Sequence, residues 1–305
     1  MLRIMLRIVS LLPAFWLAGA ATATAADNWE QQVAQNLGKS GSEMPGGVYR
    51  VGLPRTDLHV TLDGVALEPG FALGSWLAFA PLGPSADQVM AMGDLVLTDE
   101  EVNPVVSKLT AAGIDITAIH NHLLCSSPNT MYVHVLGHGA PDKLAAAFHA
   151  GLAASKTPFG AAPAAAPPSD GAQNSGLDTA AIDQALGYKG KLNGRIYQIG
   201  IPRAEPVSEG GLVVPAAMGS AIGINFQPTG GGRAAITGDF VLAAEEVNPV
   251  LKALREHGIE VTALHSHMLT ETPRMFFMHF WANDDAAKLA AGLRAALDHI
   301  KVARS

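Results

Sequence analysis

A tandem repeat constrains the fold of this 305-residue chain more than any other feature of its sequence. The segment that begins at Gly93 recurs at Gly238, 145 residues later, and the two copies then correspond without a gap as far as His134 and His279. Self-similarity at a fixed offset indicates a repeated structural unit. We therefore expect two copies of one module, related by a pseudo-twofold axis.

Composition divides the chain into four parts. Residues 1–26 combine arginines, an apolar run and small-residue Ala-x-Ala steps, which is typical of a signal peptide. Residues 157–176 are rich in Ala, Pro and Gly and lack a hydrophobic period, which indicates a linker. Module 1 is thus expected over residues 27–156 and module 2 over residues 177–305.

The signal sequence predicts export to a periplasmic or extracellular space. Its apolar run is shorter than the roughly 20 residues of a membrane-spanning helix, so we expect no stable membrane anchor after cleavage. The formal net charge of −7 offers no basic stripe for phosphates, which argues against a nucleic-acid partner. The expected partner is a small-molecule substrate or ligand, and the oligomeric state stays open.

Strand-like and helical patterns follow one another in the same order in both modules. In the first copy the expected elements are a helix over 29–37, strands near 48–53, 59–62, 74–80 and 95–97, a helix ending at 113, strands over 114–123 and 131–137, and a helix over 141–154. The last helix corresponds to residues 284–302 in the second copy. This order predicts an α+β fold in which each module is a mixed or antiparallel sheet with flanking helices.

The start of the helix that ends near residue 113 has two interpretations. Thr98 and Glu101 have the spacing of a capping box, in which each residue bonds the backbone of the other. Asn103-Pro104 could mark the helix start instead, because proline is favoured at the first helical position.

A His-x-His pair ends the expected strand 114–123. Strand residues two apart share a face, so the side chains of His120 and His122 should lie side by side. His134 on the next strand can then face them. The second copy repeats this pattern with His265, His267 and His279. Three neutral imidazoles around one point form the ligand set of a catalytic zinc, whereas hydrogen-bonded core histidines are the alternative. Copper, nickel, manganese and iron remain open as metals.

Three further residues are candidates for catalysis. Glu101 and its counterpart Glu246 precede the histidine strands and could serve as general bases, although acidic residues are also favoured in the first turn of a helix. Arg274 could orient an anionic substrate. The first copy has Asn129 at the equivalent position, so the two sites need not be equivalent.

The repeated pattern Gly-Asp-x-Val-Leu, Glu-Glu-Val-Asn-Pro-Val and Thr-Ala-x-His-x-His resembles the LppY/LpqO-type family of exported bacterial proteins of unknown function. Some of those proteins are lipoproteins, and this chain lacks their anchoring cysteine. The His-x-His…His spacing is also similar to the zinc motif of acetolactate decarboxylases and of a related zinc ester-hydrolase fold. That similarity implies that both triads act as metal ligands.

These observations predict an exported, metal-dependent hydrolase, with zinc as the first choice, that acts on an ester or related carbonyl compound. The alternative is a non-catalytic periplasmic protein that binds a metal or a small ligand. In a third interpretation, the histidines only fasten the two modules together.

Overall fold

The computed structural model describes residues 28–160 and 176–303. The predicted signal peptide, residues 1–26, and most of the predicted linker, residues 157–176, lie outside this part. Within the described ranges, no helix is long and apolar enough to cross a membrane.

Module 1 is built on a six-stranded sheet with strand order β1-β2-β5-β6-β8-β7. Every neighbouring pair in this sheet is antiparallel. Its elements are α1 (Trp29–Leu37), β1 (Ser42–Met44), β2 (Val48–Pro54), β3 (Thr61–Leu62), β4 (Val65–Ala66), α2 (Pro69–Ala72), β5 (Gly74–Pro81), β6 (Val89–Leu97), α3 (Asp99–Ala111), β7 (Asp115–His120), β8 (Met131–Gly139) and α4 (Pro141–Leu152).

Module 2 repeats this plan with strand order β15-β16-β14-β13-β10-β9, again antiparallel throughout. Its elements are α5 (Thr179–Leu186), β9 (Lys191–Asn193), β10 (Ile196–Pro202), β11 (Ser208–Glu209), β12 (Leu212–Val213), the 3₁₀ helix η1 (Ala216–Met218), β13 (Ala221–Gly230), β14 (Arg233–Leu242), α6 (Ala244–Glu256), β15 (Glu260–His265), β16 (Phe276–Asp285) and α7 (Ala286–Leu297). The predicted α+β fold with two similar halves is therefore confirmed.

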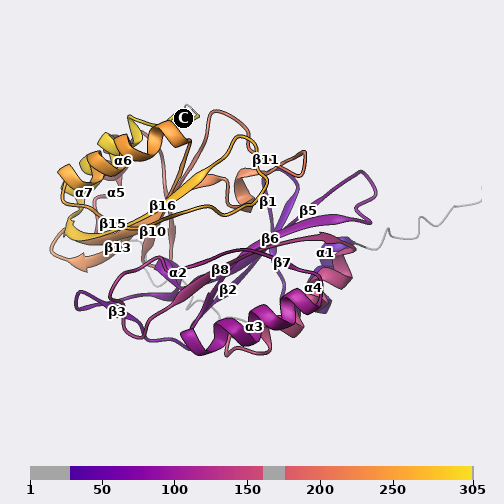
Figure 1. Ribbon diagram of the computed structural model, residues 1–305. Coiled ribbons are helices and arrows are strands. Elements are labelled where there is room, and N and C mark those ends of the chain that lie inside the picture. Colours follow the sequence, from indigo (N-terminus) through magenta and orange to yellow (C-terminus); the bar gives the residue numbers. More distant parts are fainter. Residues whose placement is uncertain (1–27, 161–175, 304–305) are drawn as a thin grey trace, which may run out of the picture.

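The two sheets face each other, and the long helices lie on the outer sides (Figure 1). Helices α3 and α4 cover the sheet of module 1, and α5, α6 and α7 cover that of module 2. One buried apolar cluster crosses the interface and joins Met90, Met92 and Leu136 of module 1 to the core of module 2. The inner sheet faces are thus held together by apolar burial, and any polar group between them is removed from bulk water.

The structure resolves two predicted boundaries. Helix α3 begins at Asp99, because the carboxylate of Glu101 accepts a hydrogen bond from the backbone N–H of Thr98 at 3.0 Å. The capping-box interpretation is therefore correct, and Asn103-Pro104 lies inside the helix. The strand predicted over 114–123 ends at His120, so His122 lies on the loop that follows β7.

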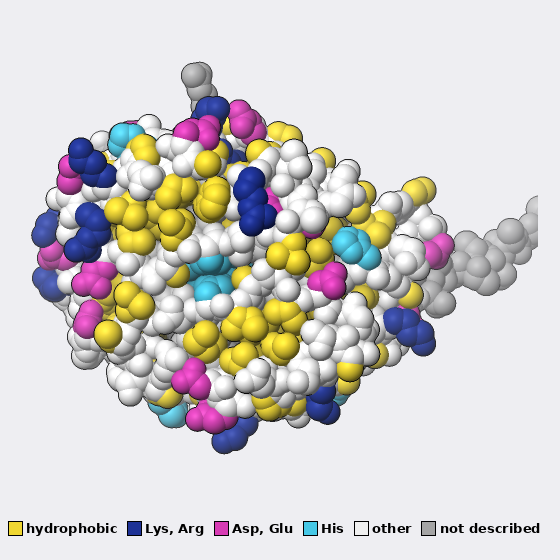
Figure 2. Space-filling view, in the orientation of Figure 1, with side chains coloured by type: hydrophobic (Ala, Val, Ile, Leu, Met, Phe, Trp, Pro, Cys, Tyr) yellow, Lys and Arg dark blue, Asp and Glu magenta, His cyan; other side chains and the backbone are white. Residues whose placement is uncertain are grey.

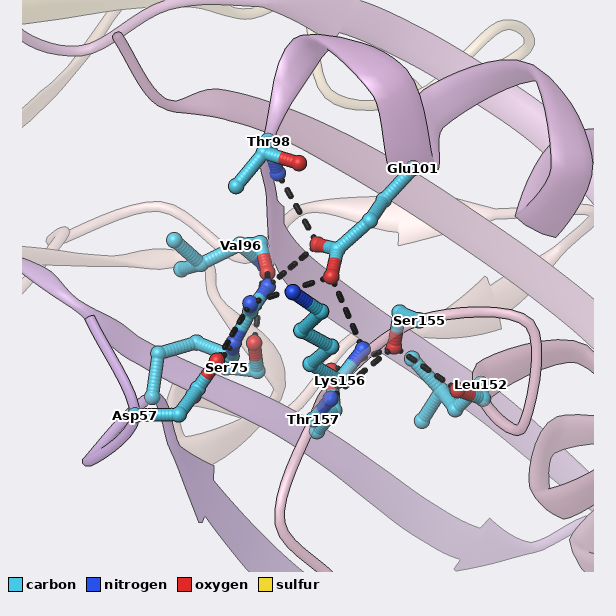
Figure 3. A network of polar contacts seen from close by, with 10 residues as sticks. Asp57, Ser75, Val96, Thr98, Glu101, Leu152, Ser155, Lys156 and Thr157 are labelled. Atoms are coloured by element: carbon cyan, nitrogen blue, oxygen red, sulfur yellow. Dashed lines mark hydrogen bonds and ion pairs between the residues drawn. The ribbon is translucent and has the colours of Figure 1, made fainter. Parts of the chain in front are cut away.

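A buried ion pair fixes the start of the equivalent helix in each module. In module 1 the guanidinium of Arg55 donates to both carboxylate oxygens of Glu101, at 2.7 and 3.2 Å (Figure 3). The backbone N–H of Lys156 also donates to that carboxylate, at 2.8 Å. Module 2 has the matching pair between Arg203 and Glu246, at 2.6 and 3.2 Å. Each pair ties the first turn of a helix to a neighbouring strand and to the chain that follows the last helix.

We predict that Glu246→Ala lowers the free energy of unfolding by about 3–5 kcal/mol at neutral pH, because it leaves the buried charge of Arg203 unpaired. Burial works to raise the pKa of Glu246, but hydrogen bonds from Arg203 and from backbone N–H groups outweigh it and hold that pKa below the ordinary value of 4.5. The contribution of Glu246 is therefore full above pH 4.5 and is lost as the pH falls further.

Urea unfolding of the wild type and the variant at several pH values measures both effects. Glu205→Ala is the control, since Glu205 forms an exposed ion pair with Lys301. Equal stability of the wild type and Glu246→Ala would show that the buried pair does not hold the helix.

Candidate metal centre

The histidines of both predicted triads converge at one place between the sheets, which we call the histidine cluster. Their rings stack in three pairs, and each pair joins one module to the other. The pairs and their ring-centroid separations are His120 with His265 at 3.5 Å, His122 with His279 at 3.6 Å, and His134 with His267 at 3.7 Å. The tertiary structure thus merges the two predicted triads into one cluster.

Strand register brings the histidines of each module together. In module 1, His134 on β8 lies opposite Ala118 on β7, two residues before His120. In module 2, His279 on β16 lies opposite Ala263 on β15 in the same way. The modules also touch directly at the cluster, where the hydroxyl of Thr262 donates to the backbone carbonyl of His122 at 2.6 Å.

In several of these histidines, the ring nitrogen Nδ1 forms a hydrogen bond with a backbone carbonyl. Nδ1 of His279 lies 2.8 Å from the carbonyl oxygen of Gly238, and Nδ1 of His120 and His265 lie 3.2 and 3.3 Å from the carbonyls of the residues that follow them. A carbonyl can only accept, so Nδ1 carries the proton in the neutral ring. The other nitrogen, Nε2, then presents a lone pair to the centre of the cluster, as in metal-binding histidines.

Eight buried polar atoms of this region have no hydrogen-bond partner among the described residues. They are the Nε2 atoms of His120, His122, His134, His265, His267 and His279 and the Oδ1 atoms of Asp94 and Asp239. An unsatisfied buried group costs about 1–3 kcal/mol, so together they would cost on the order of 8–24 kcal/mol. A typical domain is stable by only about 5–15 kcal/mol. The cluster therefore needs a partner that can accept several lone pairs at once, which is the property of a cation.

Asp94 and Asp239 lie at equivalent places on β6 and β14, each against histidines of its own module. Carboxylate oxygens of Asp94 lie 3.7 Å from Nε2 of His122 and 3.8 Å from Nε2 of His134. Those of Asp239 lie 3.5 Å from Nε2 of His267 and 3.9 Å from Nε2 of His279. These separations exceed those of good hydrogen bonds.

The spacing fits ligands that surround a metal. Two ligand atoms about 2.1 Å from a tetrahedral ion lie about 3.4 Å apart. The cluster contains four groups of residues, and within each group the ligand atoms all lie within 4.8 Å of one another. They are His120-His134-His265-His267, His120-His122-His279, Asp94-His122-His134 and Asp239-His267-His279. Buried His and Asp groups could therefore hold a metal ion here, and two of the four groups draw ligands from both modules.

Burial shifts the protonation of the cluster toward neutral groups. It lowers the pKa of His120 to about 4 and that of His265 to about 3, and it raises the pKa of Asp94 to about 8, partly offset by the charge of Arg50. Burial and the nearby Asp94 both raise the pKa of Asp239. Desolvation penalises the charged form in each case. The imidazoles are thus neutral at physiological pH, which is the state that binds metals.

A cavity of about 350 Å³ borders the cluster, a volume within the range of small-molecule sites, roughly 300–1,000 Å³. Both aspartates line it, and Arg50 is a third charged residue on its wall. The histidines on its wall are His122, His134, His267 and His279. Gly200 and Gly223 lie opposite each other on β10 and β13, and a Cβ on either would meet no atom within 4 Å. These glycines therefore leave room for a ligand.

Histidine side chains also reach the surface of the molecule. Figure 2 shows them between two groups of hydrophobic side chains on one face of the molecule. Ile119 and Leu264, which directly precede His120 and His265, are 48% and 47% exposed. The segments that carry the histidines thus come to the surface at these two residues, while the Nε2 atoms stay buried.

The structure places the three predicted catalytic residues away from the cavity wall. The carboxylates of Glu101 and Glu246 are taken up by the buried ion pairs described above. Arg274 is half exposed and contacts Glu271 at 3.3 Å. Catalysis by these residues stays a prediction, and their contacts favour a structural role.

Sequence reasoning missed Asp94, Asp239 and Arg50. The signal for the aspartates was present, because a Gly-Asp pair interrupts an apolar run at the same place in both copies. All nine residues of β6 are buried, so the charge of Asp94 lies within a buried strand. Arg50 has no arginine counterpart in module 2 and so carried no signal.

We predict that the metal-free protein is most stable near pH 6.5. The folded histidines resist protonation, so the unfolded chain gains more protons and stability falls as the pH drops below the ordinary histidine pKa of 6.5. Asp94 keeps its proton up to about pH 8 when folded, so stability also falls as the pH rises from 6.5 to 8. Thermal unfolding in the presence of a chelator, from pH 4 to 9, measures this profile.

Asp94→Asn should lessen the fall in stability between pH 6.5 and 8, and Asp239, whose pKa is also raised, should account for the fall that remains. A metal-free wild type that becomes steadily more stable between pH 6.5 and 8 would contradict the prediction.

Comparisons with known proteins identify a family but no activity. No curated protein matches this chain. Two solved structures cover most of it at low similarity. A trimeric bacterial microcompartment shell protein, PduB, has 12% identity and a TM-score of 0.21 over 87% of this chain and 96% of its own. EtuB from Clostridium kluyveri has 10% identity and a TM-score of 0.19 over 85% and 90%. At these TM-scores the likeness carries no inference.

One family model matches each module once, over residues 31–154 and 180–299. The predicted tandem repeat of an unknown-function domain is thereby confirmed. The chain belongs to the family described as Domain of Unknown Function (DUF1259).

Proposed function

We propose that this protein binds zinc at the histidine cluster and uses it to hydrolyse an ester or a related carbonyl compound. The observation that carries the proposal is the convergence of eight unpaired ligand atoms, six imidazole nitrogens and two carboxylate oxygens, from both modules. We further propose that the protein acts outside the cytoplasm, as the predicted signal peptide implies.

The ligand set supports zinc as the metal. Imidazole nitrogen with carboxylate oxygen is a common donor set of catalytic zinc sites, and no cysteine lies among the ligand groups. Copper, nickel, manganese and iron also accept such donors, so the choice is settled by affinity and by the metal that the purified protein contains.

The adjoining cavity supports an enzyme rather than a closed metal store. A bound zinc would polarise a carbonyl group and acidify water. Asp94 and Asp239 line the cavity beside the histidines, where a carboxyl group can accept or return a proton. Whichever of the two does not bind the metal replaces Glu101 and Glu246 as the general base of the proposal, because both glutamates are held in ion pairs on the helix side of each sheet.

Non-catalytic metal binding is the second candidate function. The number of ligands favours it, because eight donor atoms are enough to complete the shells of two four-coordinate ions without leaving a position for substrate.

We predict that the zinc-loaded wild type retains zinc after desalting, and that His120→Ala/His122→Ala and His265→Ala/His267→Ala each reduce the retained zinc to well below half. Each double variant breaks groups of ligands that draw on both modules. Elemental analysis of the purified proteins measures the metal content, with and without prior chelator treatment.

His138→Ala is the matched control, because His138 lies on β8 with His134 but is exposed. A loss of half the zinc in each double variant would indicate two independent sites. A wild type that neither contains nor takes up a metal would overturn the metal centre itself.

We predict that Gly223→Val keeps its zinc and loses at least about 10-fold in ester hydrolysis, since the added Cβ meets no atom within 4 Å and the new side chain takes up space at the cavity wall. Turnover of 4-nitrophenyl acetate by zinc-loaded and chelator-treated protein is the measurement. Zinc-loaded wild type without activity on any of a panel of esters would favour the non-catalytic alternative.

A further inference from the structure

Arg50 stands on β2 with its guanidinium at the wall of the cavity. Its Nη1 donates to the backbone carbonyl of Ala217 at 2.6 Å, across the module interface. The guanidinium carbon lies 3.9 Å from the centre of the Trp76 ring. The hydrogen bond and the stacked ring fix the position of the guanidinium. The Arg50 side chain therefore loses little conformational entropy when a ligand binds to it.

Two buried arginines of the described ranges have a different setting. Arg55 and Arg203 each pair with a glutamate, at 2.7 and 2.6 Å. Arg50 forms no ion pair with any carboxylate of residues 28–160 and 176–303; the charge of Asp94 acts on it only from further away. Burial lowers the pKa of Arg50 to about 10, which still leaves it charged at neutral pH. A guanidinium has five N–H donors, so most of them remain available to a ligand.

The counterpart of Arg50 in module 2 is Gln198, which follows the equivalent tyrosine on β10. Its amide nitrogen already donates to the carbonyl of Gly70 at 3.1 Å and to the side chain of Asn225 at 3.0 Å. A cavity formed by two similar modules therefore has a cation on one side only. It can distinguish the two ends of a ligand.

The charge balance of the loaded site favours an anion. Arg50 contributes +1, and Asp94 and Asp239 together contribute −2 when ionised. With one divalent ion bound, the net charge of these groups and the ion is +1, and with two ions bound it is +3. An uncompensated positive charge in a poorly solvated cavity attracts an anionic ligand strongly.

We propose that the ligand of this cavity is a small carboxylate, held by Arg50 at one end and facing the metal centre at the other. This inference names the substrate class of the metal centre and rests on the function proposed above: the ester or carbonyl compound carries a free carboxylate. A guanidinium matches a carboxylate through two parallel hydrogen bonds. Phe71, Trp76 and Ile222 on the cavity wall offer contacts for a short apolar part.

Calorimetric titration with acetate, lactate and benzoate, each beside its neutral amide, tests the inference. Zinc-loaded wild type should bind at least one carboxylate 10-fold or more tightly than the matching amide. Arg50→Gln, which installs the residue found at the equivalent place in module 2, should reduce that preference at least 10-fold and retain zinc. Arg195→Gln is the control, because Arg195 is exposed and pairs with Glu68 at the surface.

A preference that survives Arg50→Gln unchanged, or no preference in the wild type, would overturn the inference. Gly223→Val gives a second test if Arg50→Gln does not fold: it should weaken carboxylate binding, and undiminished binding would place the ligand outside the cavity.

The same titrations on zinc-free protein separate the two proposals. An Arg50-dependent preference in a protein that takes up no metal would refute the zinc centre and keep the anion site. Bound zinc without such a preference would refute the anion site and keep the zinc centre.

Discussion

The packing of two sheets face to face is the constraint on which the rest of the structure depends. Apolar burial brings the inner faces together, and the His-x-His segments lie where the modules meet. Neutral imidazoles in this setting turn their Nδ1 groups to backbone carbonyls and their Nε2 lone pairs to one another. Lone pairs that converge out of water are unfavourable unless a cation lies between them. The packing that stabilises the fold thus also brings together lone pairs that a bound cation would stabilise.

The scaffold that holds this centre is separated from the chemistry. Ion pairs on the helix side of each sheet, Arg55 with Glu101 and Arg203 with Glu246, fix the helix starts and leave the inner faces to histidine and aspartate. Duplication supplies every ligand twice, at matching positions in the two modules. The copies differ at one equivalent position on the cavity wall, which is arginine at position 50 and glutamine at position 198. One end of the shared cavity is therefore charged and the other is not, unlike in a symmetric site.

Much of the fold and the six histidines could be predicted from local patterns. Strand alternation placed His120 beside His122, and the spacing to His134 required only that two successive strands pair. The ends of elements were harder to predict. The capping box decided the start of α3, and β7 stops at His120, after which the chain forms bends and a turn. Asp94 has no periodic neighbours, and only its repetition as Asp239 marks it in the sequence. Arg50 lies more than 40 residues from Asp94 in the sequence, so no local pattern links them.

The sequence by itself determined that two copies of an α+β module exist and that each presents three histidines from two successive strands and the loop between them. Tertiary structure decided that these six side chains form one cluster, that two aspartates complete it and that an unpaired arginine faces the adjoining cavity. The reason is physical. Strand and helix periods act over a few residues and are written in local sequence, whereas the approach of two sheets depends on the fit of whole surfaces. No single segment encodes which atoms will be left facing each other there.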